Sequence, residues 1–442
     1  MSLRLALPFG LFALLATAAS AAPLPPETAC KAGAYAMPGA GRLVLSVQGE
    51  GSLGVLMPDG ERGSLQPQGN GRFVQAPPAP PLDLTVAGCP PSISLSDGRT
   101  APRVAFDEVP LTILGDGVIL AGKLVTPIGR SLREVAIFVD GSDQVGAVDR
   151  TYWQYVLPLR GVGVLILDKR GTGGSTGQPT ANFNLRADDV IAAVRAVRAR
   201  VEPGAKVGLI GFSQGGWVAP LAASREPVDF VMVAYGMAEG VTDEDREEII
   251  QNLEAAGFGA ADIRDAVELQ TAAAEVVKSH WVSGWERFDA LKARYAGAPW
   301  LKAMGQEGFT GMMVATPSAV IRQLGPKVDL GVSFEYAPAP VIAALRTRQL
   351  WILGGDDHSA PSARTRTILT DLQKVNPGLA IAVFPKADHG ITETTHEGGF
   401  THIRLSAGYL DLVARWIRTG RVPRLPGVES RPAGRGTTAT AR

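Results

Sequence analysis

Six short apolar runs dominate the middle and the C-terminal third of this chain. They lie at 135–139, 162–167, 207–210, 230–234, 350–353 and 380–384. Continuous apolar runs of this length suit strands that are buried on both faces, as in a parallel sheet covered by helices. Between the second and third runs, apolar residues recur at helical spacing over 185–200. Strand, helix and strand in this order predict a doubly wound α/β core with a mostly parallel sheet flanked by helices.

A long interval, 238–345, interrupts this rhythm because it contains no apolar strand run. We predict a helical cap inserted into the core there, with helices at 243–256, 260–279 and 285–295. The core itself is then assigned to 111–237 and 346–422. The cap carries Trp281, Trp285 and Trp300. These rings either line a substrate pocket or pack the cap against itself.

The segment 23–110 has a different composition, rich in glycine and proline, with short alternating stretches at 42–47 and 82–86. This pattern predicts a small β-rich N-terminal domain. The proline-rich stretch 75–81 cannot pair inside a sheet, so we expect a loop. The tail 423–442 has few apolar residues and is predicted to be disordered.

The first residues, 1–22, read as a signal peptide: a short basic start, an apolar run over 5–19, and small residues before cleavage near Ala21 or Ala22. The competing interpretation is a membrane anchor, but the run falls short of the roughly 20 residues that a span needs. The chain has 2 cysteines, Cys30 and Cys89. In an exported protein, periplasmic or secreted, a disulfide between them is plausible, and two free buried thiols are the alternative.

Charge and apolar content restrict the class of partner. Lysine plus arginine number 43 and aspartate plus glutamate number 43, so no basic surplus points to nucleic acid. With 45% hydrophobic residues the chain can bury a sizeable core. We therefore expect a neutral substrate, or one whose charge is locally sorted, and no nucleic acid as the partner. After removal of the signal peptide we expect no stable membrane anchor.

A Gly-x-Ser-x-Gly motif at 211–215 follows the run at 207–210 directly and precedes a segment that can begin a helix. A serine in such a strand-turn-helix setting sits on a strained turn that projects its hydroxyl above the sheet. Residues two before and two after it must be small for that turn to form. The motif predicts Ser213 as a nucleophile.

A serine hydroxyl needs a histidine to take its proton and a carboxylate to orient that histidine. Of the 5 histidines, His389 leaves the last predicted strand as a loop and is the predicted base, with His358 a minor alternative. Of the others, we predict His280 in the cap, His396 in a loop and His402 in a terminal helix. For the acid, the strand at 350–353 runs into Asp356 and Asp357. The spacing favours Asp357, and Asp356 remains an alternative.

The tetrahedral intermediate of acyl transfer needs backbone donors for its oxyanion. The amide after the nucleophile, that of Gln214, is one candidate. The other comes from the turn after the run at 135–139, where Ser142 is the predicted donor and Gly141 lets the backbone approach the substrate. No metal and no organic cofactor is needed for this chemistry.

Taken together, these residues resemble the secreted α/β-hydrolases close to the serine aminopeptidase and dienelactone hydrolase branches, over about 106–418. The most specific element is the Asp-x-Arg-Gly-x-Gly-x-Ser type of turn at 168–175. The resemblance implies that Asp168, Arg170 and Gly171 shape the active-site floor. A phosphate-binding loop is the rival, but no Lys-Ser/Thr pair closes it. Relatives commonly carry histidine before the oxyanion-turn glycine, where this chain has Asp140.

The expected function is therefore that of a serine hydrolase that cleaves carboxylic esters or related acyl bonds through an acyl-enzyme. Peptide or amide hydrolysis is the runner-up, so we expect a small-molecule ester or acyl compound, or a short peptide, as the partner. A different class, a hydrolase-fold binding protein without turnover, would be signalled by a missing triad member, and all three are present. Haloalkane dehalogenase and epoxide hydrolase chemistries use aspartate where this chain has Ser213.

Overall fold

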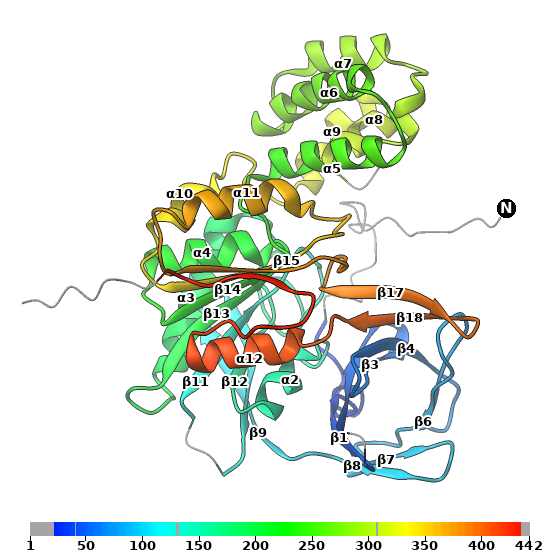
Figure 1. Cartoon of the computed structure of the whole chain (residues 1–442), viewed down its shortest axis with the longest axis vertical. Helices are drawn as coiled ribbons and strands as arrows, with labels where there is room; N and C mark the ends of the chain where they lie inside the picture. Colours follow the sequence, from blue (N-terminus) through cyan, green and yellow to red (C-terminus); the bar gives the residue numbers. More distant parts are fainter. Residues whose placement is uncertain (1–21, 40, 130–131, 306–307, 435–442) are drawn as a thin grey trace, which may run out of the picture.

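The computed structural model describes residues 22–39, 41–129, 132–305 and 308–434. Apart from its last residue, the predicted signal peptide lies outside these ranges. Figure 1 shows a central α/β part, a helical part above it and a β-rich part at its lower right. Within the described residues, no helix combines the length and the apolar character that crossing a membrane requires.

The central sheet has the strand order β19-β16-β15-β14-β13-β11-β12-β10-β9. The neighbours from β12 to β16 run parallel, whereas β9, β10 and β19 pair antiparallel at the two edges. Each predicted apolar run lies in one parallel strand, which confirms the α/β prediction. The bounds are β9 (Phe106–Leu114), β10 (Ile119–Pro127), β11 (Glu134–Val139), β12 (Gly163–Leu167), β13 (Lys206–Phe212), β14 (Phe230–Ala234), β15 (Arg348–Gly354), β16 (Leu379–Phe384) and β19 (Glu429–Arg431).

Helices cover both faces of this sheet because successive strand side chains point to opposite sides. On β11, Ala136 and Phe138 join the core cluster that includes α2 (Trp153–Leu159) and α12 (Tyr409–Thr419). Val135 and Ile137 join the cluster on the opposite face. That face carries α3 (Phe183–Arg198), α4 (Gly215–Arg225), α10 (Pro338–Ala344) and α11 (Ser362–Leu372). The strands are thus buried on both faces, which explains their continuous apolar sequences.

The β-rich part is a second sheet in which β1 to β8 pair consecutively and antiparallel. A bridge between Tyr35 and Arg103 brings its two ends together. Cys30 and Cys89 form a disulfide within this part. The elements are α1 (Pro26–Ala29), β1 (Gly33–Met37), β2 (Gly41–Val47), η3 (Gly49–Gly51), β3 (Leu53–Leu56), β4 (Glu61–Pro67), β5 (Arg72–Gln75), β6 (Asp83–Thr85), β7 (Ser92–Leu95) and β8 (Thr100–Pro102).

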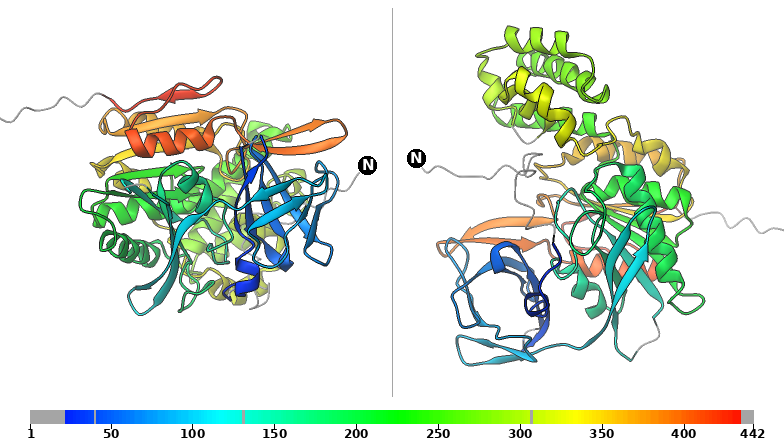
Figure 2. Two further views of the ribbon diagram at one scale, coloured as in Figure 1. Left: turned by 90° about the horizontal axis from the view of Figure 1, so that it is seen from below. Right: turned by 180° about the vertical axis from the view of Figure 1, so that it is seen from behind.

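A hairpin from the C-terminal half, β17 (Thr392–Glu397) and β18 (Phe400–Leu405), joins the β-rich sheet. Strand β18 pairs antiparallel with β4, and Figure 2 shows the hairpin beside the β-rich part. The assignment of all of 346–422 to the core was therefore wrong for this hairpin, and His402 lies in β18 rather than in a helix. The hairpin is mostly polar and carries no apolar run. Two of its residues, Ile403 and Arg404, pair with Arg62 and Glu61 at the start of β4. Backbone pairing of this kind requires no apolar pattern, so the sequence gives no signal of it.

The C-terminal tail is also more ordered than predicted. Strand β19 pairs with β16, where Val383 lies opposite Glu429 and Ile381 opposite Arg431. Residues 435–442 lie outside the described part of the chain. The prediction of disorder over 423–442 was wrong at β19. An edge strand is held by backbone hydrogen bonds on one side, so it can form with few apolar side chains.

The inserted helices lie above the sheet in Figure 1. They are α5 (Val241–Ala255), α6 (Ala260–Lys278), α7 (Trp285–Arg294), η4 (Pro299–Lys302), α8 (Phe309–Ala315) and α9 (Ser318–Val328). Trp281, Trp285 and Trp300 belong to the core of this cap and are buried. The Trp285 indole N–H donates to the backbone of Trp281 at 2.9 Å. Of the two roles considered for these rings, the structure supports packing of the cap against itself.

Candidate active site

Ser213 lies in the turn between β13 and α4, with a φ of +51° that non-glycine residues rarely adopt. The flanking glycines are required sterically. A Cβ atom on Gly215 would come closer than 3.0 Å to the backbone oxygen of Val139, and one on Gly211 would do the same to that of Gly215. The sequence therefore folds into a strained strand-to-helix turn, the local structure that Gly-x-Ser-x-Gly predicts.

His389 and Asp357 come together after the carboxyl ends of β16 and β15. The Nδ1 atom of His389 lies 3.0 Å from Oδ2 and 3.2 Å from Oδ1 of Asp357. The Asp357 carboxylate is buried and also accepts hydrogen bonds from the amides of Ser359 and Ala360, at 3.0 and 2.8 Å. These bonds hold the carboxylate in place against the imidazole ring.

The alternatives for acid and base lie elsewhere. Asp356 is exposed, and His389 bonds to its neighbour Asp357 instead. His358 is exposed, with its Nδ1 atom 3.7 Å from Oδ1 of Asp388. His396 and His402 lie in the β17–β18 hairpin, where His402 contacts Glu61 at 2.9 Å. The geometry thus favours the pair Asp357 and His389 over the other candidates.

Tyr235 is a site residue that the sequence reasoning missed. It directly follows β14, and its ring centroid lies 4.8 Å from that of His389 in an edge-to-face contact. Its φ is +43°, and its amide donates to the backbone oxygen of Ile352 at 2.8 Å. The available signal was its position at the carboxyl end of a central parallel strand, where side chains of α/β sites gather.

The loop after β11, residues 140–143, lies against the nucleophile. A Cβ atom on Gly141 would be 3.4 Å from the Cβ atom and 3.9 Å from the Oγ atom of Ser213. The amide of Gly141 donates to the Oδ1 atom of Asp140 at 2.8 Å, so this N–H is engaged. The predicted oxyanion donors, the amides of Ser142 and Gln214, belong to two separate segments, the loop after β11 and the turn that carries Ser213.

Two cations, the largely buried Lys169 and the buried Arg186, donate hydrogen bonds to this loop. The Lys169 ammonium donates to the backbone oxygens of Gly141, at 3.0 Å, and of Asp143, and lies 3.3 Å from Oδ2 of Asp140. The Arg186 guanidinium donates to the backbone oxygen of Asp140 at 2.6 Å and to the side-chain oxygen of Gln214. Arg186 thus ties together the two segments that carry the predicted oxyanion donors.

Removing these two cations from water raises the free energy of their charged forms, and their pKa values shift accordingly. Burial lowers the pKa of the Lys169 ammonium, and the Asp140 carboxylate opposes that change. Burial lowers the pKa of Arg186 to about 10, again opposed by Asp140. Asp140 therefore balances two positive charges beside the loop.

The turn at 168–175 is held by polar contacts within itself and with neighbouring segments. The Asp168 carboxylate accepts from the amides of Val148 and Gly174, each at 2.9 Å. Arg170 forms a two-pronged ion pair with Asp189, with both distances 2.7 Å. These contacts agree with a structural role for Asp168 and Arg170.

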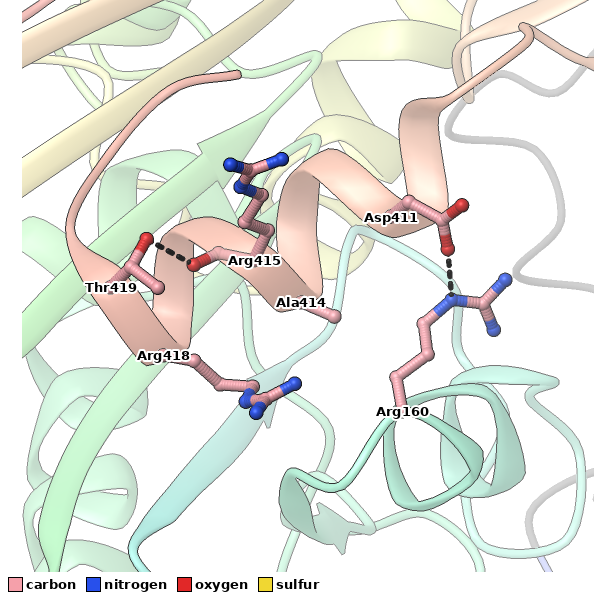
Figure 3. A pocket seen from close by; sticks show the side chains of 6 residues that line it. All are labelled: Arg160, Asp411, Ala414, Arg415, Arg418 and Thr419. Atoms are coloured by element: carbon pink, nitrogen blue, oxygen red, sulfur yellow. Dashed lines mark hydrogen bonds and ion pairs between the residues drawn. The ribbon is translucent and has the colours of Figure 1, made fainter.

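Two further features lie outside this arrangement. Within the described residues, no group of three or more His, Cys, Asp and Glu side chains could hold a metal ion. A surface hollow of about 450 Å³ lies between α12 and the end of α2 and contains none of the site residues. Figure 3 shows its lining, in which Arg160 reaches Asp411 at 2.8 Å.

The sheet order and the strained serine turn define the class of this protein as an α/β-hydrolase. A model of the Alpha/beta hydrolase family matches residues 141–398, more than half of the chain, so the chain belongs to this family. A comparison with curated protein sequences found no match.

Solved structures also resemble the chain. An esterase from Pyrococcus furiosus is 15% identical, with 64% of this chain and 84% of that chain covered and a TM-score of 0.42. The Pyrococcus horikoshii acylaminoacyl peptidase is 13% identical, with 87% and 55% covered and a TM-score of 0.44. A proline iminopeptidase from Mycobacterium smegmatis is 17% identical, with 70% and 98% covered and a TM-score of 0.43.

Proposed function

We propose that this protein is a serine hydrolase that cleaves carboxylic esters through an acyl-enzyme intermediate. The observation that carries the proposal is the hydrogen bond between His389 and the buried Asp357, at the same end of the sheet as the strained turn of Ser213. Membership of the Alpha/beta hydrolase family supports hydrolytic chemistry at this end of the sheet.

In the acylation step, the Oγ atom of Ser213 bonds to the ester carbonyl carbon and its proton moves to Nε2 of His389. Asp357 accepts the Nδ1–H bond, which fixes the tautomer with a free Nε2 and stabilises the imidazolium that forms. Collapse of the tetrahedral intermediate breaks the bond to the alcohol oxygen. The alcohol leaves with the proton that His389 returns.

In the deacylation step, water hydrolyses the acyl-enzyme and releases the carboxylic acid. His389 takes a proton from water, the hydroxide bonds to the acyl carbon, and the proton returns to Ser213 as the ester bond to the enzyme breaks. In both steps the amides of Gln214 and Ser142 donate to the oxyanion. Preorganised donors of this kind supply a large share of the rate enhancement, because they need no reorientation when charge develops.

The test is labelling with a fluorophosphonate, which reacts with activated serines, together with turnover of p-nitrophenyl esters of graded acyl length and of aminoacyl anilides. We expect labelling and ester turnover by the wild type and neither by Ser213→Ala. Folded wild-type protein that is not labelled would identify a binding protein without turnover. Faster cleavage of the anilides than of the esters would show that the protein is a peptidase or amidase rather than an esterase.

We further propose that the protein is exported to the periplasm or beyond the cell. The apolar run at 5–19 with the small residues after it supports this, and so does the Cys30–Cys89 disulfide, which suits an oxidising compartment. Cell fractionation and N-terminal sequencing of the purified protein test the proposal. A mature chain that begins near Ala22 is expected, and cytoplasmic protein that retains Met1 would contradict it.

A further inference from the structure

One cation from the β-rich part reaches the loop that carries His389. Strand β18 pairs with β4 so that Ile403 lies opposite Arg62, and this hairpin begins at Thr392, soon after the His389 loop. A Cβ atom on Gly390 would lie 3.7 Å from the Nη1 atom of Arg62. The guanidinium is therefore next to the residue that follows the predicted base, although Arg62 is far from it in sequence.

Aromatic residues connect this guanidinium with the catalytic histidine. The Cζ atom of Arg62 lies 5.3 Å from the centroid of the Tyr152 ring. Burial raises the pKa of the Tyr235 phenol, and the charge of Arg62 acts against this increase. Tyr235 in turn contacts the ring of His389, the residue before Gly390, where the guanidinium of Arg62 lies. Arg62 thus contacts Tyr152, His389 contacts Tyr235, and the charge of Arg62 acts on the pKa of both tyrosines.

Arg62 has no carboxylate within ion-pairing distance among residues 22–434 that the structure describes. Its chain neighbour Glu61 binds Arg404 at 2.8 Å and His402 at 2.9 Å instead. Asp140, which also faces the site, is paired with Lys169. Other arginines of the same sheet do have acidic partners, as Arg72 has in Asp83 at 2.6 Å. Arg62 is half-buried, so its positive charge is partly removed from water without being neutralised.

We propose that Arg62 binds an anionic group of the substrate, so that the preferred substrates are esters that also carry a carboxylate. The inference rests on the proposed ester hydrolysis. A guanidinium offers planar paired donors that match a carboxylate, and partial burial strengthens such a bond. In this arrangement the β-rich part determines substrate choice, while the α/β core supplies the predicted triad.

The experiment compares two p-nitrophenyl esters of similar length, the neutral valerate and the anionic hemiglutarate, on wild type, Arg62→Met and Arg62→Lys. We expect the wild type to prefer the hemiglutarate. Arg62→Met should lower kcat/KM for the anionic ester roughly 10- to 100-fold, the worth of a hydrogen-bonded charge pair, and change kcat/KM for the valerate less than about twofold. Arg62→Lys should restore part of the preference.

Arg72→Met is the matched control because Arg72 lies in the same sheet but pairs with Asp83. It should leave the ratio of the two kcat/KM values unchanged. Equal losses on both esters in Arg62→Met would assign Arg62 a structural role and overturn the inference. A wild type that hydrolyses both esters equally would also overturn it while leaving ester hydrolysis intact. Failure of fluorophosphonate labelling and of both turnovers would instead refute the proposed function and the inference with it.

Discussion

The Nδ1 atom of His389 lies 3.0 Å from the Oδ2 atom of Asp357, whose side chain is 1% exposed while that of the histidine is 29% exposed. This relationship joins two loops that follow neighbouring parallel strands, β15 and β16. A buried carboxylate that also accepts two backbone amides has a fixed orientation. The Nδ1 side of the imidazole is thereby fixed, as the general-base role proposed for His389 requires.

Asp357→Asn should lower kcat for ester hydrolysis roughly 10⁴-fold, because an amide stabilises the wrong histidine tautomer. Asp356→Asn is the matched control, since Asp356 is exposed and the His389 imidazole bonds to Asp357 instead. Steady-state kinetics on a p-nitrophenyl ester measures both. A larger loss in the Asp356 variant would reassign the acid.

Lys169→Met should lower kcat roughly 10²-fold with little change in KM, because the loop that carries the predicted Ser142 donor loses its support from behind. Lys169→Arg should recover part of the loss. The control is Lys374→Met, an exposed lysine that pairs with Asp371. If KM rises and kcat stays constant, Lys169 acts on ground-state binding and the positioning role is wrong.

Gly215→Ala should destabilise the protein by about 1–3 kcal/mol, because the new Cβ atom meets the backbone of Val139. It should also reduce turnover by displacing the Ser213 turn. Gly49→Ala offers a comparison, since its Cβ atom would have no heavy atom within 4 Å. Thermal unfolding and ester turnover are measured together. Equal melting temperatures for the two variants would contradict the steric argument.

Stability should fall as the pH rises from about 4.5 to 7, and Glu239 should cause part of this. Burial raises the pKa of Glu239 from 4.5 to about 7, although Arg364 opposes the shift. The folded state therefore binds the proton more tightly, so this contribution is full below pH 4.5 and lost as the pH passes 7. Asp245, with a pKa raised by burial to about 6, acts in the same direction.

Glu239→Gln should flatten the dependence of the melting temperature on pH in this window, leaving the part due to Asp245. Glu254→Gln, at an exposed position of α5, is the control and should follow the wild type. A Glu239 variant whose profile matches that of the wild type would show that this carboxyl does not titrate as its burial implies.

Removal of the disulfide by Cys30→Ser with Cys89→Ser should cost about 4 kcal/mol of unfolding free energy, from the loop entropy of a 59-residue separation. Chemical denaturation with and without a reductant measures it. The reductant should destabilise the wild type and leave the double variant unchanged. A wild type insensitive to complete reduction would contradict the prediction.

Local pattern was sufficient for the α/β core and for the serine turn. Each apolar run became a strand because burial on both faces demands unbroken apolar sequence. The glycines around Ser213 predicted their turn for a similar reason, since the backbone there leaves no room for a Cβ atom. Both inferences depend on neighbours within a few residues, and such neighbours are visible in a sequence.

The tertiary structure alone decided which distant residues meet. Asp356 and Asp357 are adjacent, and only the path of the chain after β15 directs the second toward His389. The same holds for Tyr235 against His389, and for Arg62, which reaches the site because the hairpin of β17 and β18 pairs with β4. Strand pairing uses backbone groups that every residue carries, so the sequence does not show which strand the β17–β18 hairpin will pair with.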